Sequence, residues 1–369
     1  MKSYDYLIVG AGLFGSVFAR EMTDRGKKCL VIDRRNHIGG NVYTENVEGI
    51  NVHKYGPHIF HTNDERIWQY VNRHAEFNSY RHRVRVVHGG TEYSFPINLK
   101  TLQQLWGVDS SEEARALLDI KKVAIGNPSN LEDWILSQVG EELYEIFVKG
   151  YTIKQWGREP RDLPSSIIRR IPIRTEANED YFDDRFQGIP KGGYTGLVAN
   201  LLKGIEVRLN CDFFQDRVGL TDLAGKVVYT GPLDSFFNCD LGNLEYRSLR
   251  FENEKLDLKQ FQSLAQINYS EPDIPFTRII EHKHFEFGTQ SHTVITREYP
   301  TEWSKGAEPY YPINDSKNKK LADEYQRRAE KLREQILFGG RLAEYRYYDM
   351  HQVVGAALNA VERAIQTEG

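Results

Sequence analysis

The chain has 369 residues, of which 40% are apolar and 27% are charged, and its formal net charge is −4. These values are typical of a water-soluble protein long enough for two or three domains, and they exclude a general attraction to nucleic acid or anionic lipid. Three cysteines without a CxxC pair argue against a disulfide framework and a thiolate metal site, whereas 21 tyrosines favour a polar site with aromatic faces.

The first elements follow the order strand, glycine turn, helix, strand. An apolar run at 6–9 leads into GAGLFG, helical spacing follows in SVFAREMTDRG, and KCLVID is a second apolar run. The N-terminus lacks the apolar core and cleavage site of a signal peptide, and no apolar run approaches the ~18 residues of a membrane span. We therefore expect a cytoplasmic protein with neither membrane nor nucleic-acid partners.

The glycine turn has the spacing GxGxxG, formed by Gly10, Gly12 and Gly15. The first glycine permits the tight turn, the second lets the backbone approach a pyrophosphate, and the third allows close helix packing. Asp33 ends the next strand and can accept a hydrogen bond from a ribose hydroxyl. This context predicts an adenine dinucleotide site, and the motif is shared by NAD and FAD proteins.

The segment after Asp33 differs from that of a simple dehydrogenase. In place of a third βαβ repeat the chain runs through RRNHIGGNVYTENVEGINVHKYGPHIFHT, which is rich in Gly, Asn and His. This pattern resembles flavoproteins with an interrupted FAD-binding sheet, in which a late segment, here FGGRLAEYRYYDMHQVVGAAL, closes the site. A short helix is expected at 63–72, followed by a hairpin that turns at Gly89 and Gly90.

The middle of the chain changes from helical to strand periodicity. Helices are predicted in LKTLQQLWG, in SEEARALLDIKKVAIG with Ser110 or Ser111 as cap, and in LEDWILSQVGEELYEIFVKGY. The runs IEVRLN and KVVYTGPLD indicate a return to a parallel sheet, and alternation over 247–298 predicts an antiparallel sheet. The chain then ends in a strand, a turn, an irregular linker and an amphipathic helix.

The stretch KGYTIKQWG sets Tyr151 and Trp156 between lysines and glycines. By itself it favours an amphipathic helix that runs out into a turn, with both rings in a core. A ligand site with flat aromatic faces is the alternative.

These elements predict an α/β fold: an interrupted Rossmann-like FAD-binding domain with a helical subdomain and an antiparallel β-sheet subdomain. The FAD-binding domain is discontinuous and comprises 1–78, 187–242 and 318–369. The helical subdomain covers 99–165. The antiparallel sheet and substrate subdomain comprises 79–98, 166–186 and 243–317.

Several separate stretches resemble the prokaryotic UDP-galactopyranose mutase family, along essentially the whole chain. They are GAGLFG, HIGGN, YGPHIFHT, GYTIKQWG, IIRRIPIR, DDRFQGIPKGGYT, TGPLD, RIIEHKHF, REYP, PYYP and GGRLAEYRYYDM, in the family's order.

The resemblance implies interconversion of UDP-galactopyranose and UDP-galactofuranose by reduced FAD, with no net redox change. In the family, the reduced flavin N5 attacks the anomeric carbon, a flavin-sugar iminium holds the open sugar, and the ring then contracts. A homodimer and an unidentified reductant of the flavin are implied as well.

The family's site residues map onto this chain position by position. As catalytic residues the resemblance implies Arg170, Arg278 and His58. For the substrate it implies Phe147, Tyr151, Thr152, Trp156, Arg170, Tyr181, Phe182, Asn268, Arg278, Tyr311 and Tyr347. For FAD it implies Gly10, Gly12, Phe14, Gly15, Asp33, Arg34, Gly39, Gly40, Asn41, His58, Ile59, Arg341, Tyr347, Asp349 and Met350.

Other functions remain open on the sequence. A flavin-dependent oxidoreductase of amine-oxidase-like type would share the FAD motifs but not the arginine and tyrosine set, and a non-catalytic UDP-sugar-binding flavoprotein is a third possibility. A metal site at His53, His58 and His61, or at His282 and His284 on one face of a strand, lacks an accompanying motif, so no metal is expected. A glycosidase using Glu298, Glu344 or Asp349 would leave GxGxxG unexplained.

Overall fold

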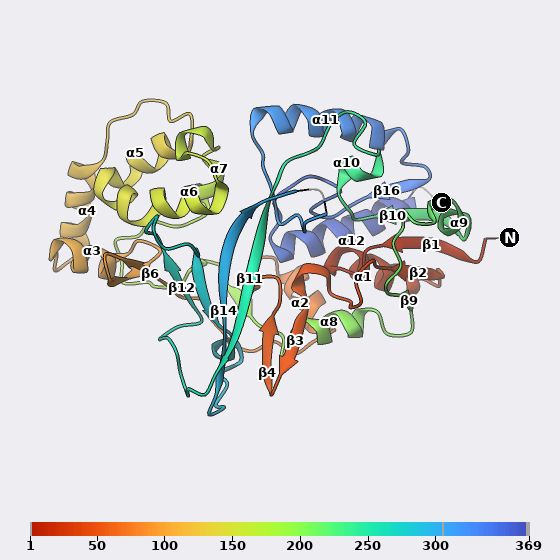
Figure 1. Ribbon diagram of the computed structural model, residues 1–369, viewed down its shortest axis with the longest axis horizontal. Helices are drawn as coiled ribbons and strands as arrows, with labels where there is room; N and C mark the ends of the chain where they lie inside the picture. Colours follow the sequence, from red (N-terminus) through yellow and green to blue (C-terminus); the bar gives the residue numbers. More distant parts are fainter. Residues whose placement is uncertain (1, 305, 367–369) are drawn as a thin grey trace.

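The computed structural model describes residues 2–304 and 306–366, and Figure 1 shows how the elements are arranged. Helices α3 to α7, within residues 99–169, gather at one end of the molecule, at the left of Figure 1, and the first two strands, β1 (Tyr4–Val9) and β2 (Cys29–Ile32), lie toward the other end. The long strands β11 (Tyr246–Leu256) and β14 (Thr293–Glu302) lie between these two ends. Within the described ranges, every helix is too short or too polar to cross a bilayer.

A parallel sheet forms the nucleotide-binding end. Its strands, in the spatial order β16, β10, β1, β2, β9, are Ile336–Phe338, Ala224–Tyr229, Tyr4–Val9, Cys29–Ile32 and Glu206–Arg208. Each adjacent pair is parallel, and Tyr6 of β1 lies between Lys226 and Cys29. The predicted returns to the sheet at IEVRLN and KVVYTGPLD are confirmed as β9 and β10.

Both faces of this sheet are covered, because alternate strand residues point to opposite sides. Tyr6 and Ile8 pack with α1 (Leu13–Thr23), α8 (Tyr194–Leu201) and α12 (Met350–Gln366). Leu7 and Leu30 pack on the other side, with α9 (Arg217–Asp222) and α10 (Leu233–Phe236). The carboxyl ends of β1 and β10 are left free for the glycine turn and for Thr230.

A mixed sheet occupies the centre of the molecule. Its strands, in the spatial order β15, β11, β14, β13, β12, β6, β7, are Tyr311–Pro312, Tyr246–Leu256, Thr293–Glu302, Arg278–Glu281, Gln266–Tyr269, Val84–His88 and Thr91–Phe95. The pairs are antiparallel as predicted, except that β12 lies parallel to β6. That junction joins the predicted hairpin, which the structure forms from β6 and β7, to a strand about 180 residues later.

The helical end contains α3 (Leu99–Trp106), α4 (Ser111–Lys121), α5 (Leu131–Tyr144), the π-helical turn η2 (Glu145–Lys149), α6 (Gly150–Trp156), the 3₁₀ turn η3 (Pro160–Asp162) and α7 (Ser166–Arg169). Ser110 caps α4, as one of the two predicted candidates. The third predicted helix is not continuous, because Gly140 has a φ of 80° and breaks α5.

The remaining elements connect these layers. They are α2 (Glu65–Asn72), α11 (Ser316–Glu330), the turn η1 (Gly40–Val42), the turn η4 (His282–Glu286), the pair β3 (Thr44–Val47) and β4 (Ile50–His53), and the pair β5 (Phe60–Thr62) and β8 (Phe186–Gly188). The helix predicted at 63–72 is confirmed, and Asp64 caps it. The division of the chain into three domains stays a prediction.

Candidate functional site

A single cavity of about 1000 Å³ extends from the glycine turn to the helical end. Every site residue expected from the sequence lines it. The structure therefore brings together residues that are up to 340 positions apart in the chain, whereas their individual roles stay predictions.

The glycine turn lies at one end of the cavity. Gly12 is the N-cap of α1, and no side chain caps the helix, so its first N–H groups remain available to an anion. A Cβ at Gly10 would overlap the Thr230 hydroxyl, and a Cβ at Gly15 would overlap the Gly10 carbonyl. The turn thus depends on glycine for its packing as well as for its shape.

Asp33 and the HIGGN segment complete this end. The Asp33 carboxylate accepts from the N–H groups of Ala11 and Arg35, at 2.8 and 2.9 Å. Gly39 and Gly40 have φ values of 94° and 55°, and a Cβ at Gly40 would lie 3.0 Å from Gly12 Cα. The two glycine segments therefore approach each other closely, which leaves room for an extended ligand along their backbones.

The cavity also has lining residues at this end that the sequence analysis missed. They are Cys211, Phe213, Phe214, Arg217, Tyr229 and Thr230 among others. Phe213 packs against Tyr229 on β10, and Arg217 lies 4.0 Å over the ring of Phe236. KVVY followed by TGPLD indicated a return to the parallel sheet. Ligands bind at the carboxyl ends of such strands, so the position of Thr230 directly after this strand could have identified it as a lining residue.

Helix α6 and the preceding turn η2 supply the opposite end. Phe147, Tyr151 and Gln155 are spaced by four residues, so they share one face, and all three line the cavity. The helix stops at Gly157, whose φ of 62° suits a left-handed C-cap. KGYTIKQWG is therefore a helix that runs out into a turn, as its pattern favours, and its aromatic side chains face a cavity.

Gln155 was not among the predicted residues. The residue is 7% exposed, and its Oε1 atom has no hydrogen-bond partner among the described residues. A buried amide without a partner costs about 1–3 kcal/mol, so a ligand that donates to it would be favoured. The four-residue spacing from Phe147 and Tyr151 was the signal that could have identified it.

Arg278 lies in the wall formed by the mixed sheet. It is directly opposite Glu298 in the antiparallel register of β13 and β14, and its guanidinium forms an ion pair with that carboxylate at 2.7 Å. Glu298 is 0% exposed. Burial tends to lower the pKa of Arg278, but the Glu298 carboxylate and nearby tyrosines outweigh it and the net pKa is raised. Arg278 thus remains a cation in the cavity.

Arg170 follows α7 and reaches the cavity from the helical end. Its guanidinium lies 5.0 Å from the centre of the Tyr347 ring and 4.0 Å from the Asp349 carboxylate. The side chain is 44% exposed, so it stands at the mouth of the cavity. Tyr347 in turn stacks on Tyr311, with ring centres 6.0 Å apart.

Tyr151, Tyr181 and Tyr311, which lie around these arginines, stay neutral. Burial raises the pKa of Tyr311 to about 12 and moves the pKa values of Tyr151 and Tyr181 above the usual value as well. Their hydroxyls can therefore donate hydrogen bonds to phosphate oxygens between the two arginines.

His58 is an uncharged residue in the cavity wall. Burial, with smaller contributions from Arg341 and Arg278, lowers its pKa to about 4. Its Nδ1 lies 2.8 Å from the Gly56 carbonyl, which can only accept, so the proton is on Nδ1 and Nε2 is free to accept.

His82 is a second buried histidine in the wall, and the sequence analysis missed it. Burial, with the Arg278 charge, lowers its pKa to about 3. It lies beside Tyr181 and Phe182, with ring centres 5.4 and 6.0 Å apart. The alternating pattern RHRVRV could have indicated that the His82 side chain points inward, because arginines flank it on both sides. In the structure both arginines are exposed and His82 is buried.

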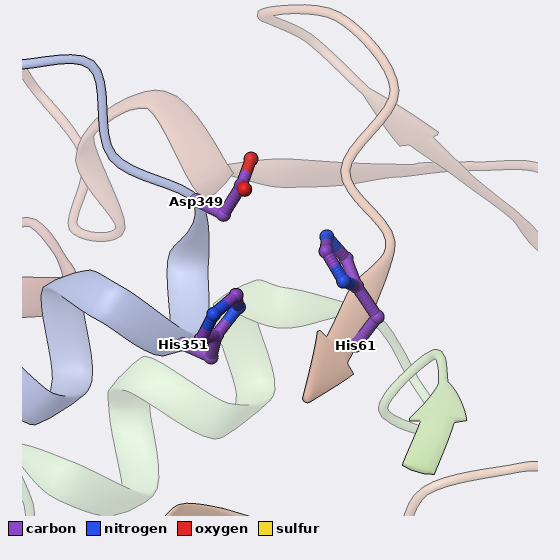
Figure 2. A group of neighbouring side chains, drawn as sticks. All are labelled: His61, Asp349 and His351. Carbon is purple, nitrogen blue, oxygen red and sulfur yellow. The ribbon is translucent and has the colours of Figure 1, made fainter. Parts of the chain in front are cut away.

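His61, Asp349 and His351 form a group beside the cavity, and Figure 2 shows their side chains directed toward one another. One ligand atom of each lies within 4.8 Å of the others. Nδ1 of His61 is hydrogen-bonded to Asp184, and Arg170 already faces Asp349. Because Asp349 also belongs to the residues expected around FAD, this group belongs to the same site, and the absence of a metal stays a prediction.

The expectation that His282 and His284 lie on one face of a strand is wrong. His282 and His284 lie in the 3₁₀ turn η4, not on a strand. His282 is bonded to the Thr296 hydroxyl at 2.6 Å, and His284 to the Glu281 carboxylate at 3.0 Å. Strand β13 ends one residue earlier, so the two rings have separate protein partners.

Two family models match the chain. The model of UDP-galactopyranose mutase matches residues 146–347, and that of the NAD(P)-binding Rossmann-like domain matches residues 8–74. The first includes α6, Arg170, Arg278 and Tyr347, and the second includes the glycine turn.

Full-length relatives and solved structures agree with these matches. The chain is 40% identical to a probable UDP-galactopyranose mutase of Klebsiella pneumoniae, over 100% of this chain and 96% of the relative. It is 37% identical to a dTDP-fucopyranose mutase of Escherichia coli, over 98% of each. The fold is similar to that of a reduced UDP-galactopyranose mutase, with a TM-score of 0.78, 14% identity and coverage of 100% of this chain and 95% of that one.

Proposed function

The chain belongs to the UDP-galactopyranose mutase family, and we propose that it interconverts UDP-galactopyranose and UDP-galactofuranose with a bound, reduced FAD. One observation supports this proposal above the others. A glycine turn suited to a dinucleotide and a set of arginines, tyrosines and aromatic residues suited to a second nucleotide line the same cavity.

The glycine end fits FAD by its residue chemistry. The uncapped N-terminus of α1 suits a pyrophosphate, and Asp33 suits a ribose hydroxyl. Gly39, Gly40, Arg341 and Met350 would continue along the cofactor toward His58. When bound and reduced, the flavin would supply the nucleophile for the anomeric carbon.

Arg170 and Arg278 would bind the diphosphate of the sugar nucleotide. Both are cations that line the cavity, and Tyr311 and Tyr347 add hydroxyl donors between them. Departure of UDP from the sugar places negative charge on the diphosphate, and these donors are already in position to stabilise it. They would also hold the detached nucleotide close by, so that it can return to the sugar.

Helix α6 would bind the base. The ring of Tyr151 or Phe147 offers a flat face, and stacking on a base contributes about 1–3 kcal/mol. The unpartnered Oε1 of Gln155 can accept from the imide N–H of a pyrimidine such as uracil.

The sugar would lie between these two ends. His58 and His82 are uncharged there and can accept or donate hydrogen bonds to sugar hydroxyls without attracting the diphosphate. Arg170, at the mouth of the cavity, would exclude water when the diphosphate draws it inward.

A second candidate substrate is a dTDP-fucose. The dTDP-fucopyranose mutase of Escherichia coli is nearly as similar to this chain as the Klebsiella relative, and over the same length. Thymine keeps the imide N–H from which Gln155 Oε1 would accept a hydrogen bond, and the diphosphate is unchanged. The two candidates differ only at the methyl group of the base, the ribose 2′-hydroxyl and C6 of the sugar.

A substrate panel tests the proposal. Chemically reduced, FAD-loaded protein is incubated with UDP-galactofuranose, its 2-acetamido derivative and dTDP-fucofuranose, and the pyranose products are separated by chromatography. We expect conversion of UDP-galactofuranose by reduced protein and little by oxidised protein. A higher kcat/KM for the dTDP sugar would select the second candidate.

Loss of all three conversions with stoichiometric FAD bound would refute the mutase proposal. Consumption of oxygen with an amine substrate would instead favour the amine-oxidase-like alternative, and a colourless protein that takes up no FAD would remove the cofactor from the proposal. We also propose a homodimer in the cytoplasm that receives electrons from a separate reductant, and analytical ultracentrifugation tests the dimer.

A further inference from the structure

Lys154 is a charged residue of α6 that the proposed function leaves unused. It lies in the middle of KGYTIKQWG, between the cavity residues Thr152 and Gln155, but it is not part of the cavity lining. Its Nζ points instead to the turn that joins β12 to β13. There it donates to the carbonyl oxygens of Tyr269, Ile274 and Phe276 at 2.7, 3.0 and 3.1 Å.

Three carbonyl acceptors match the three donors of an ammonium group. No carboxylate forms an ion pair with Nζ among the described residues, so the lysine is held by backbone alone. Glu271 and Asp273 in the same turn act on it only through space. One side chain of α6 is thus hydrogen-bonded to three backbone carbonyls of one connection, and we call these three bonds the Lys154 clamp.

The backbone of α6 also lies close to the backbone of this turn. A Cβ at Gly150, the first residue of α6, would overlap the Ser270 carbonyl oxygen at the start of that turn. Helix α6 therefore touches the turn closely at one end and is bonded to it at Lys154.

A second set of bonds holds the end of the helix. Arg247 of β11 is 3% exposed and donates to the carbonyls of Gln155 and Lys154, at 3.0 and 3.3 Å. Its guanidinium also pairs with Glu302 of β14. The charged groups around Lys154 are thus Glu271 and Asp273 of the turn, which act on its ammonium, and Arg247, which binds its backbone carbonyl and is itself paired with Glu302.

The two elements joined by the clamp carry different parts of the proposed substrate site. Helix α6 has Tyr151 and Gln155 for the base, whereas β12 and β13 have Asn268 and Arg278 for the ribose and diphosphate. A nucleotide has a fixed distance between these groups. The spacing between helix and hairpin therefore determines whether both ends bind at once.

We propose that Lys154 is a positioning residue, which sets the spacing between the base-binding helix α6 and the β12–β13 hairpin and so determines nucleotide affinity. The inference rests on the proposed function, since it assumes that a pyrimidine nucleotide spans these elements. Burial lowers the pKa of Lys154 to about 8. Above that pH the neutral amine would lose its charge-assisted bonds, and affinity would fall.

The test measures binding of UDP, and of dTDP in parallel, to oxidised FAD-loaded protein by isothermal titration calorimetry. Lys154→Met should weaken binding about tenfold, the loss expected for one or two charge-assisted hydrogen bonds. Lys154→Arg should restore most of it. In turnover assays KM should rise by a similar factor while kcat stays within about twofold. Lys149→Met is the matched control, because that partly exposed lysine pairs with Glu145 and, among the described residues, donates to no carbonyl of the β12–β13 turn.

The pH dependence separates positioning from a merely structural role. Wild type and Lys149→Met should lose affinity between pH 7 and pH 9, whereas Lys154→Arg should lose less, because arginine keeps its charge. Any titration of the ligand affects all three proteins equally. Lys154→Arg remains informative even if Lys154→Met does not fold.

The outcomes distinguish this inference from the proposed function. A wild type that binds neither nucleotide would overturn both. A wild type that binds UDP or dTDP, with an unchanged affinity in Lys154→Met or an identical pH response in Lys154→Arg, would overturn the inference alone.

Discussion

Arg278 and Glu298 illustrate how single residues set the chemistry of the cavity. The sequence identified Arg278 by resemblance, yet nothing in the pattern REYP indicated that Glu298 is its partner. The pairing depends on the register of β13 with β14, which places the two residues opposite each other. The register between two strands cannot be predicted from one sequence, because the alternation of polar and apolar residues determines only the sheet face on which a residue lies.

Replacement of Arg278 by alanine should abolish turnover and destabilise the fold. It leaves the fully buried Glu298 carboxylate without its cation, and such a loss typically costs about 3–5 kcal/mol. Urea unfolding and turnover of Arg278→Ala measure the two effects.

The double variant Arg278→Ala with Glu298→Gln should regain much of the stability but none of the turnover. Arg250→Ala is the control, because Arg250 and Glu252 form an exposed pair on β11. Equal stability of Arg278→Ala and the wild type would contradict a role for the ion pair.

Arg170→Ala should lose most turnover and keep FAD bound. The guanidinium stands over Tyr347 at the cavity mouth, where it would contact the diphosphate and not the cofactor's glycine cradle. Arg169→Ala is a close control, since the Arg169 guanidinium lies 5.8 Å from the ring of Trp134 and does not line the cavity. Steady-state kinetics with the flavin absorbance spectrum give both readouts, and normal turnover of Arg170→Ala would refute its role.

At the scale of elements, local signals were the reliable ones. The strand, glycine turn and helix of GAGLFG, the hairpin at Gly89 and Gly90 and the cap at Ser110 depend on neighbouring residues, and the structure confirms each. Three features were missed because they depend on distant contacts. They are the break of α5 at Gly140, the π-helical turn η2, and the parallel junction of β12 with β6.

Gly150→Ala should weaken nucleotide binding and lower stability. A methyl group at this position would overlap the Ser270 carbonyl, so helix and hairpin would have to move apart. We expect a destabilisation of about 1–3 kcal/mol, typical of overpacking. Thermal unfolding and UDP titration provide the measurements.

Gly196→Ala on α8 is the opposite case and serves as the control. A Cβ there has nothing within 4 Å, and alanine favours a helix over glycine by about 1 kcal/mol. The same substitution should therefore stabilise one helix and disrupt the other. A stabilised Gly150→Ala would show that α6 has room to move.

For the molecule as a whole, buried neutral histidines connect stability to pH. Burial lowers the pKa of His58 to about 4 and the pKa values of His82 and His282 to about 3, from an ordinary value of 6.5. The unfolded chain takes up these protons below pH 6.5, but the folded chain does so only near pH 3 to 4. Their contribution is therefore fully present above pH 6.5 and is lost as the pH falls toward 3.

The free energy of unfolding should accordingly drop on acidification, with each such histidine adding up to about 1.4 kcal/mol per pH unit. His282→Gln removes one of them without touching the cavity. Between pH 5.5 and 4.5, the free energy of unfolding of His282→Gln should change less steeply with pH than that of the wild type. The difference should be about 1.4 kcal/mol per pH unit, which corresponds to one proton, whatever the absolute stability of the variant. Urea unfolding with FAD in fixed excess measures both slopes, and equal slopes would contradict the assignment.

The strand order of the parallel sheet has a consequence for synthesis of the chain on the ribosome. Strand β1 needs β10 beside it, and β10 in turn needs β16, which lies more than 320 residues after β1. At a translation rate of about 5–20 residues per second, the glycine turn waits roughly 15 s to a minute for these neighbours. Nascent chains would therefore expose an unpaired apolar strand edge throughout that interval. Cofactor loading should be a late event, after residues 336–350 have emerged, and chaperones that shield strand edges should raise the yield of yellow protein.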